Sequence, residues 1–171
     1  MAEELNVGDK VPDFTVPCVW GKEFTLSEIV KKAPVVFYFY PLNYGMQCTA
    51  YTIMMNDYYE GFEAIGTQMF HVNNATVEEH RKWMGRIATR YDHIADKEYV
   101  VGRIFGMLVP SPMKNDPPLT NRGFAMVGID MKLLYIWRAP STINTLEFEP
   151  LIDELYHILK NERAPDGDAQ Q

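Results

Sequence analysis

Hydrophobic residues follow two patterns along the chain. Short unbroken runs of β-branched and aromatic residues, clearest at residues 35–40 (VVFYFY), are typical of strands that are covered on both faces. Other segments place apolar residues three or four positions apart, which is the spacing of an amphipathic helix. Because the two patterns alternate, they predict an α/β fold with helices on both faces of a mixed central sheet.

The first half of the chain is predicted to contain a hairpin, two helices and two inner strands. The expected order is a hairpin of residues 13–16 and 22–26 around Gly21, a helix 27–31, a strand 35–40, a helix 47–64 and a strand 67–73. Pro41 ends the first inner strand, because proline has no N–H group to donate to a sheet.

The second half begins with a local helix signal. Thr76 and Glu79 have the spacing of a capping box, which opens a helix. Its expected buried face comprises Val77, His80, Met84, Ile87 and Tyr91. The elements expected to follow are a helical segment 99–107, a loop 109–121 with four prolines, strands 124–127 and 132–137, and a final helix. This final helix has Leu151, Ile152, Leu155, Ile158 and Leu159 on one face.

Length and composition predict one domain. The chain has 171 residues, of which 47% are hydrophobic and 23% charged, so residues 4–161 can form a globular core. Residues 162–171 are expected to be a polar tail. The net charge of −7 argues against nucleic acid as a partner, since phosphates would be repelled.

Other classes of function find no support in the pattern. We expect no membrane span and no secretory signal, and we expect a cytoplasmic location. No glycine-rich phosphate loop and no zinc-ligand spacing is found, so we expect neither a cofactor nor a metal.

Cys48 is the candidate for reactive chemistry. It follows a buried strand, a proline and a short loop, at the predicted start of a helix. The partial positive charge and the unpaired N–H groups of a helix N-terminus favour a thiolate, which is the nucleophilic form of cysteine. The alternative on position alone is a small apolar core residue.

The segment 40–49 (YPLNYGMQCT) resembles the peroxiredoxin (AhpC/TSA) motif P-x-x-x-T-x-x-C-T, with Pro41, Cys48 and Thr49 in place. Similar segments follow the family order at residues 8–17, 21–29, 72–87, 93–107 and 121–137. The resemblance implies a thioredoxin-like fold and a peroxidatic Cys48 that reduces hydrogen peroxide or alkyl hydroperoxides through a sulfenic acid. It also implies a homodimer or a larger ring, and a thiol reductant such as thioredoxin, glutaredoxin or a small thiol.

Two departures from the motif lie beside the cysteine. The threonine of the family falls on Gly45, and Tyr51 stands where an acidic residue is often found. Thr49, Tyr44, Asn43 or a water molecule could supply the lost hydroxyl. These departures leave open a slower peroxidase, a different substrate, or an inactive thioredoxin-fold binding or redox-regulatory module.

The family also needs an arginine near the sulfur. Arg122 is the first candidate, since it precedes a strand as the family's arginine does. A two-residue shift in the alignment would instead place Phe124 there and leave Arg138 as the fallback. Pro41 is expected to help shield the site from water.

Cys18 occupies none of the positions of the family's common resolving cysteines. A one-cysteine mechanism with an outside thiol is therefore expected, with Cys18 as the alternative resolving residue or as a buried apolar residue. His71 and His80 are expected to be structural histidines whose nitrogens are hydrogen-bonded.

Overall fold

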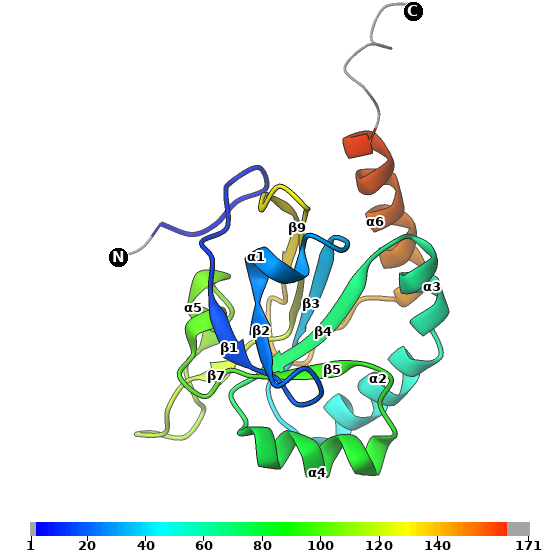
Figure 1. The fold of residues 1–171 in the computed structure, drawn as a ribbon. Coiled ribbons are helices and arrows are strands. Elements are labelled where there is room, and N and C mark those ends of the chain that lie inside the picture. Colours follow the sequence, from blue (N-terminus) through cyan, green and yellow to red (C-terminus); the bar gives the residue numbers. More distant parts are fainter. Residues whose placement is uncertain (1–2, 164–171) are drawn as a thin grey trace, which may run out of the picture.

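The computed structural model describes residues 3–163, which form nine strands and six helices. Their order along the chain is β1 (Thr15–Pro17), β2 (Glu23–Thr25), α1 (Leu26–Ile29), β3 (Val35–Phe39), α2 (Met46–Asn56), α3 (Tyr59–Ala64), β4 (Gln68–Asn73), α4 (Val77–Ile87), β5 (Asp92–Ala95), α5 (Val100–Ile104), β6 (Leu108–Val109), β7 (Leu119–Thr120), β8 (Gly123–Val127), β9 (Leu133–Arg138) and α6 (Phe148–Arg163). Figure 1 shows their arrangement.

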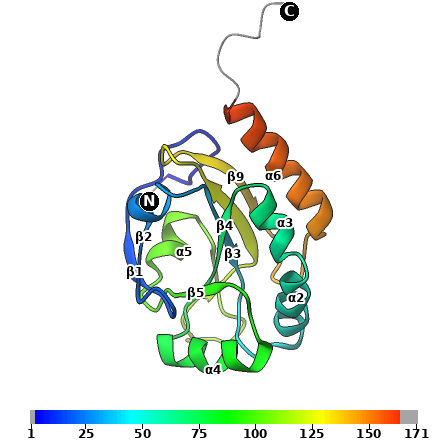
Figure 2. The same ribbon diagram turned by 45° about the vertical axis from the view of Figure 1, so that its right-hand side comes forward.

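A five-stranded mixed sheet forms the centre of the molecule, in the order β5-β4-β3-β8-β9. Strands β3, β4 and β5 are parallel, whereas β8 runs antiparallel to β3 and β9 runs antiparallel to β8. Helices α2, α3 and α6 lie on one side of this sheet, and α1, α5 and the β1–β2 hairpin lie on the other (Figures 1 and 2). The predicted mixed α/β architecture is confirmed.

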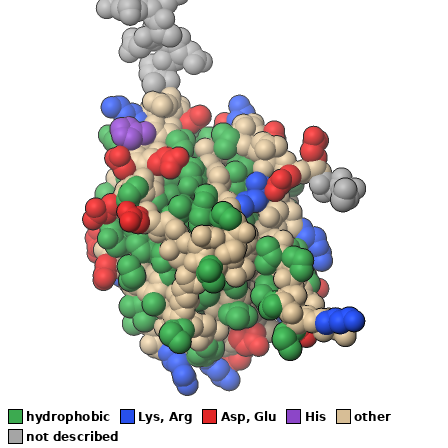
Figure 3. Space-filling model, turned by 180° about the vertical axis from the view of Figure 1, so that it is seen from behind, with side chains coloured by type: hydrophobic (Ala, Val, Ile, Leu, Met, Phe, Trp, Pro, Cys, Tyr) green, Lys and Arg blue, Asp and Glu red, His purple; other side chains and the backbone are tan. Residues whose placement is uncertain are grey.

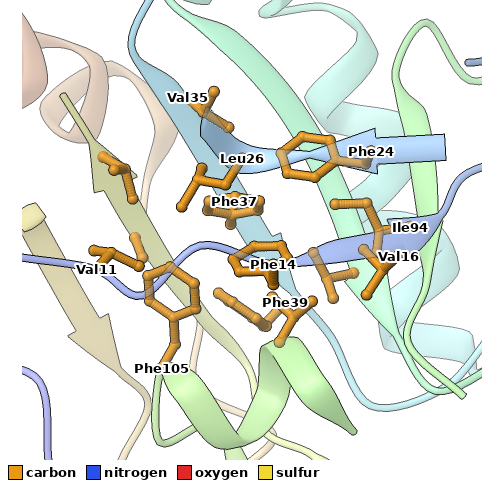
Figure 4. Close-up of a cluster of buried hydrophobic side chains, with 14 of the residues drawn as sticks. Val11, Phe14, Val16, Phe24, Leu26, Val35, Phe37, Phe39, Ile94 and Phe105 are labelled. Carbon is orange, nitrogen blue, oxygen red and sulfur yellow. The ribbon is translucent and has the colours of Figure 1, made fainter. Parts of the chain in front are cut away.

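The alternation of side chains along β3 divides the core into two clusters. Val35, Phe37 and Phe39 face the hairpin, α1 and α5, where they pack with Phe14, Phe24 and Phe105 (Figure 4). The residues between them, Val36 and Tyr38, together with Tyr40, face α2, α3 and α6. All the residues of β3 are buried, as the unbroken apolar run predicts.

The predicted helix 47–64 is wrong as a single element, because the chain forms α2 and α3 there. The N–H groups of Asp57 and Tyr58 bond to carbonyls three residues earlier, which tightens the turn. Tyr58 has φ −102° and ψ 7°, outside the helical region. Its ring packs on Phe148 of α6, with centroids 4.9 Å apart. The break between α2 and α3 therefore coincides with a contact to α6, and the spacing of apolar residues within 47–64 does not reveal it.

Helix α4 carries the capping box that the sequence predicts, but it ends before Tyr91. Ala88 adopts the left-handed conformation with φ 47°, which terminates the helix. The Asn56 side chain approaches the carbonyl oxygens of Ile87 and Ala88 at 3.4 Å. Tyr91 lies beyond the helix end and leads into β5 instead.

Three strands were not predicted. Strand β5 contains Asp92 and His93, polar residues that are untypical of a buried strand. Strands β6 and β7 pair with each other at the ends of the proline-rich segment that we expected to be all loop. At the C-terminus, α6 continues to Arg163, past the predicted boundary at 161, and residues 164–171 of the expected tail lie outside the described residues.

Candidate active site

The loop of residues 41–45 connects the carboxyl end of β3 to the start of α2. Gly45 is the N-cap of α2, no described side chain caps the helix, and Cys48 is its third residue. No capping side chain among the described residues therefore occupies the first-turn N–H groups of the helix that carries Cys48. Cys48 is buried, with 5% of its surface exposed.

Arg122 contacts the sulfur. Its Nη2 atom donates to Cys48 Sγ at 3.3 Å, although 74 positions separate the two residues. The register explains the contact, because Phe39 at the end of β3 pairs with Gly123 at the start of β8. Arg122 immediately precedes β8, so it lies beside the loop that leads from β3 to Cys48.

The same register separates the two candidate arginines. Arg122 lies two residues before Phe124, so both point to the same face of the sheet, and Phe124 belongs to the cluster that contains Cys48. Arg138 pairs with Gly123, whose position faces the other side of the sheet, so Arg138 points away from that cluster. Its guanidinium donates to the carbonyl oxygens of Phe105 and Leu5, away from the sulfur. Phe124 is a buried core residue opposite Tyr38.

Three further groups surround the Arg122 guanidinium. Nη1 donates to the hydroxyl of Tyr38, Nε donates to the carbonyl oxygen of Thr142 at 3.0 Å, and the ring of Tyr51 lies 5.6 Å away. Burial opposes the charge, but Tyr38 and Cys48 more than offset it and raise the pKa of Arg122 above its ordinary value. The residue is therefore a permanent cation.

The residues proposed to bind substrate lie in different surroundings. Thr49 is half-buried and bonds back to Gly45 through both its N–H and its hydroxyl. Tyr44 has φ 63°, is half exposed, and packs its ring edge-on against Trp83 of α4 at 4.9 Å. Pro41 is buried directly after Tyr40, at the end of the inner strand.

Asn43 has contacts that the sequence did not suggest. Its Oδ1 accepts from Tyr40 Oη at 2.6 Å and from Asn73 Nδ2 at 3.1 Å. Its Nδ2 lies 3.3 Å from His80 Nδ1 on α4. The amide therefore links the loop of residues 41–45 to β4 and α4, and none of these bonds involves the Cys48 sulfur.

Tyr38 and Thr142 are site residues that sequence reasoning missed. Tyr38, whose hydroxyl accepts from Arg122, looks in the sequence like any other aromatic residue of a buried strand. Thr142 accepts from Arg122 through its backbone carbonyl oxygen, which every residue has, so its side chain gives no signal. The alternation of side chains within β3 places Tyr38 on the same side of the sheet as Cys48. This alternation predicts a contact between Tyr38 and Arg122 only once the position of Arg122 is known.

Cys18 lies on the other side of the sheet from Cys48. The two residues belong to different core clusters, and both are free. Burial, followed by the nearby charge of Asp92, raises the pKa of Cys18 to about 12. Its thiol is therefore protonated at neutral pH.

The expectation of hydrogen-bonded histidines is wrong for His71. Neither of its ring nitrogens has a partner among the described residues, and the Nε2 atoms of His80 and His93 also lack one. The rings of His71 and His80 lie 4.8 Å and 5.1 Å from that of His93. Within residues 3–163, no group of three or more side chains has the geometry of a metal site.

No helix among the described residues is long and apolar enough to cross a membrane.

A mixed five-stranded sheet with helices on both faces, together with a buried cysteine at a helix start in contact with an arginine, is the arrangement of a thioredoxin-like α/β protein with a thiol site. Residues 7–136 match the model of the AhpC/TSA family, and the chain belongs to this family. It is 28% identical over 164 residues to a chloroplastic 2-Cys peroxiredoxin BAS1 of Hordeum vulgare, covering 90% of this chain and 73% of the relative. It spans 58% of the length of the Spinacia oleracea and Arabidopsis thaliana proteins of the same name.

Solved structures have the same fold. Peroxidoxin BcpB from Mycobacterium tuberculosis has a TM-score of 0.77 at 21% identity, covering 94% of this chain and all of its own. A cysteine-to-serine mutant of peroxiredoxin 6 from Arenicola marina has a TM-score of 0.85 at 16% identity, covering 95% of this chain and 79% of its own. The thioredoxin-like fold is therefore confirmed.

Proposed function

We propose that the protein is a thiol-dependent peroxidase that uses Cys48 to reduce hydrogen peroxide or an alkyl hydroperoxide. The observation that carries the proposal is the 3.3 Å contact between Arg122 Nη2 and Cys48 Sγ at an uncapped helix N-terminus. A fixed cation and free N–H groups stabilise the thiolate and the charge that develops on the peroxide oxygens. Family membership supports the same reaction.

The reaction balances with two outside thiols. The Cys48 thiolate attacks one peroxide oxygen, the S–O bond forms as the O–O bond breaks, and the leaving oxygen takes a proton to become water or an alcohol. One thiol then converts the sulfenic acid into a mixed disulfide and releases water. A second thiol attacks that disulfide and returns Cys48 to its thiolate.

The position of Cys18 supports a one-cysteine mechanism. Its side chain is buried on the opposite face of the sheet, and its thiol is protonated at neutral pH. We therefore propose thioredoxin, glutaredoxin or a small thiol as the reductant. Pro41, buried at the end of the strand that precedes the loop, would limit the access of water to the sulfur.

A homodimer in the cytoplasm is part of the same proposal. Hydrophobic side chains are interspersed with charged ones over the face shown in Figure 3. The exposed large residues include Leu42, Tyr44 and Met46 of the loop and first turn, with Met46 exposed over 90% of its surface. Such residues are suitable for contact with a second copy. The two free cysteines suit a reducing compartment.

The competing function is an inactive thioredoxin-fold binding or regulatory module. Two observations favour it: Gly45 offers no hydroxyl to the sulfur, and the hydroxyl of Thr49 is engaged by the helix backbone. This module would have the same fold but would not form a sulfenic acid at Cys48.

Trapping the sulfenic acid separates the two functions. The reduced protein, treated with one equivalent of hydrogen peroxide and a sulfenic-acid probe, should carry the adduct on Cys48, and the Cys48→Ser variant should carry none. Arg122→Lys should slow adduct formation at least tenfold, because lysine cannot reproduce the forked contact. The matched Arg138→Lys variant should react like the unmodified protein. Absence of the adduct in the unmodified protein would favour the inactive module.

A further inference from the structure

Arg122 is a buried cation without a carboxylate partner among the described residues. The residue is 1% exposed, and none of the salt bridges among residues 3–163 includes it. The groups that accept its hydrogen bonds are a phenol, a backbone carbonyl and the Cys48 sulfur. Of these three acceptors, the sulfur is the one whose anion, a thiolate, is the nucleophile of the proposed reaction.

We infer that Tyr38 is the positioning residue that fixes Arg122 against the sulfur, in place of a carboxylate. This inference rests on the proposed function, since it assigns a role to the arginine of that site. Nη1 donates to Tyr38 Oη, Nε donates to the Thr142 carbonyl oxygen, and Nη2 is left for Cys48. Two anchors at adjacent positions of a planar, rigid group determine where the third nitrogen points.

Tyr38 is itself held rigidly. It is fully buried in β3, the central strand of the sheet. Its ring stacks on Tyr40 at 5.5 Å, packs on Phe124 at 5.0 Å and on Tyr51 at 5.6 Å, and meets His71 edge-on at 5.1 Å. A side chain packed on every side offers a fixed hydrogen-bond acceptor to the guanidinium.

The neutrality of the phenol has a chemical consequence. Burial raises the pKa of Tyr38 well above its ordinary value, so the group is uncharged at neutral pH. A carboxylate at the same place would neutralise the guanidinium and weaken its attraction for a thiolate. Tyr38 holds the cation in position and leaves its charge uncompensated, so that Cys48 is the group that pairs with it.

The experiment measures the rate of Cys48 alkylation by iodoacetamide from pH 5 to pH 9. In Tyr38→Phe, the rate at pH 7 should fall about tenfold and the profile should move to higher pH, as expected for the loss of one hydrogen bond to a charged group. The substitution keeps the ring, and a melting curve verifies that the variant is folded. Tyr91→Phe is the matched control, since it loses a buried bond to the Met55 carbonyl oxygen and should leave the profile unchanged.

A double-mutant comparison tests whether Tyr38 acts through Arg122. Adding Tyr38→Phe to an Arg122→Met variant should cause no further loss, because the group being positioned is already absent. An unchanged profile in Tyr38→Phe, or a full additional loss in the Arg122→Met background, would overturn the inference. Alkylation needs no peroxidase activity. If the protein forms no sulfenic acid but Tyr38→Phe still shifts the profile, the proposed function fails and the positioning role stands.

Discussion

Thr49 is bound to Gly45 twice across one helical turn. The N–H group of Thr49 donates to the Gly45 carbonyl oxygen at 2.8 Å, and its hydroxyl donates to the same oxygen at 2.6 Å. The second bond directs the Thr49 hydroxyl to the helix backbone. Thr49 therefore does not replace the hydroxyl that is missing at residue 45.

Restoring that hydroxyl should accelerate the reaction. A Cβ atom at Gly45 would lie 3.7 Å from Cys48 Sγ and 3.7 Å from Leu42, which is ordinary contact, and φ is −61°. In Gly45→Thr, the second-order rate constant for hydrogen peroxide should rise about tenfold, because a donor is placed beside the reacting oxygens. Stability should rise by about 0.5 kcal/mol, because the unfolded chain loses freedom. Stopped-flow kinetics and thermal melting measure the two effects.

Gly45→Val is the matched control, because it adds the same branched shape without a hydroxyl. It should gain none of the rate, and it should be less stable than Gly45→Thr, because residue 45 is the N-cap of α2 and valine cannot cap the helix. Equal rate constants for hydrogen peroxide in the two variants would show that the hydroxyl has no effect. Any difference from the unmodified protein would then come from the branched side chain.

Alkylation should distinguish the two cysteines. Burial and Asp92 raise the pKa of Cys18 to about 12, so its thiolate is scarce at pH 7.5. Iodoacetamide should label Cys48 alone in the folded protein and both cysteines in 8 M urea, as read by peptide mass spectrometry. Cys18→Ala should keep its peroxidase turnover with dithiothreitol within about twofold. A Cys18–Cys48 disulfide formed after peroxide treatment without added thiol would instead identify Cys18 as a resolving residue.

Acid should destabilise the fold through the buried histidines. Burial lowers the pKa of His71 to about 3 and that of His80 to about 4, whereas the unfolded chain takes up these protons near pH 6.5. Between pH 6.5 and about 4 the unfolded state thus binds more protons, and the free energy of unfolding falls by about 1.4 kcal/mol per pH unit for each imidazole. Urea denaturation at pH 7, 6 and 5 measures this slope.

His71→Phe tests the origin of the slope. Both ring nitrogens of His71 lack partners among the described residues, and its ring stacks on Tyr91 at 4.8 Å, a contact that phenylalanine can keep. The variant should be at least as stable at pH 7 and should lose about 1.4 kcal/mol per pH unit less below pH 6.5. A slope equal to that of the unmodified protein would exclude His71 as its source.

Asn43 should hold the active-site loop in place. Asn43→Ala removes the acceptor shared by Tyr40 and Asn73 and the contact with His80. Amide hydrogen exchange over residues 42–48 should become faster, and the reaction with peroxide should slow several-fold, because the loop that precedes Cys48 opens more often. Asn74→Ala is the control, since it loses one bond, to Tyr99, outside this network. Equal exchange in both variants would contradict the role of Asn43.

Local signals predicted the elements that depend on local interactions. The capping box of Thr76 and Glu79 marks the start of α4, and the apolar run of residues 35–40 marks the buried central strand. Elements that depend on distant partners were missed. Strand β5 is stabilised by pairing with β4, and the break before α3 coincides with packing of Tyr58 on Phe148. Neither partner can be read from the adjacent sequence.

By itself the sequence determined the alternation of strands and helices and the position of Cys48 at the start of a helix, because periodicity and caps are local properties. Only the tertiary structure decided that Arg122 meets both Cys48 and Tyr38, that Arg138 does not, and that Cys18 lies across the sheet. These outcomes depend on strand register, where a shift of one residue moves a side chain to the opposite face. Register is set by contacts between segments tens of residues apart.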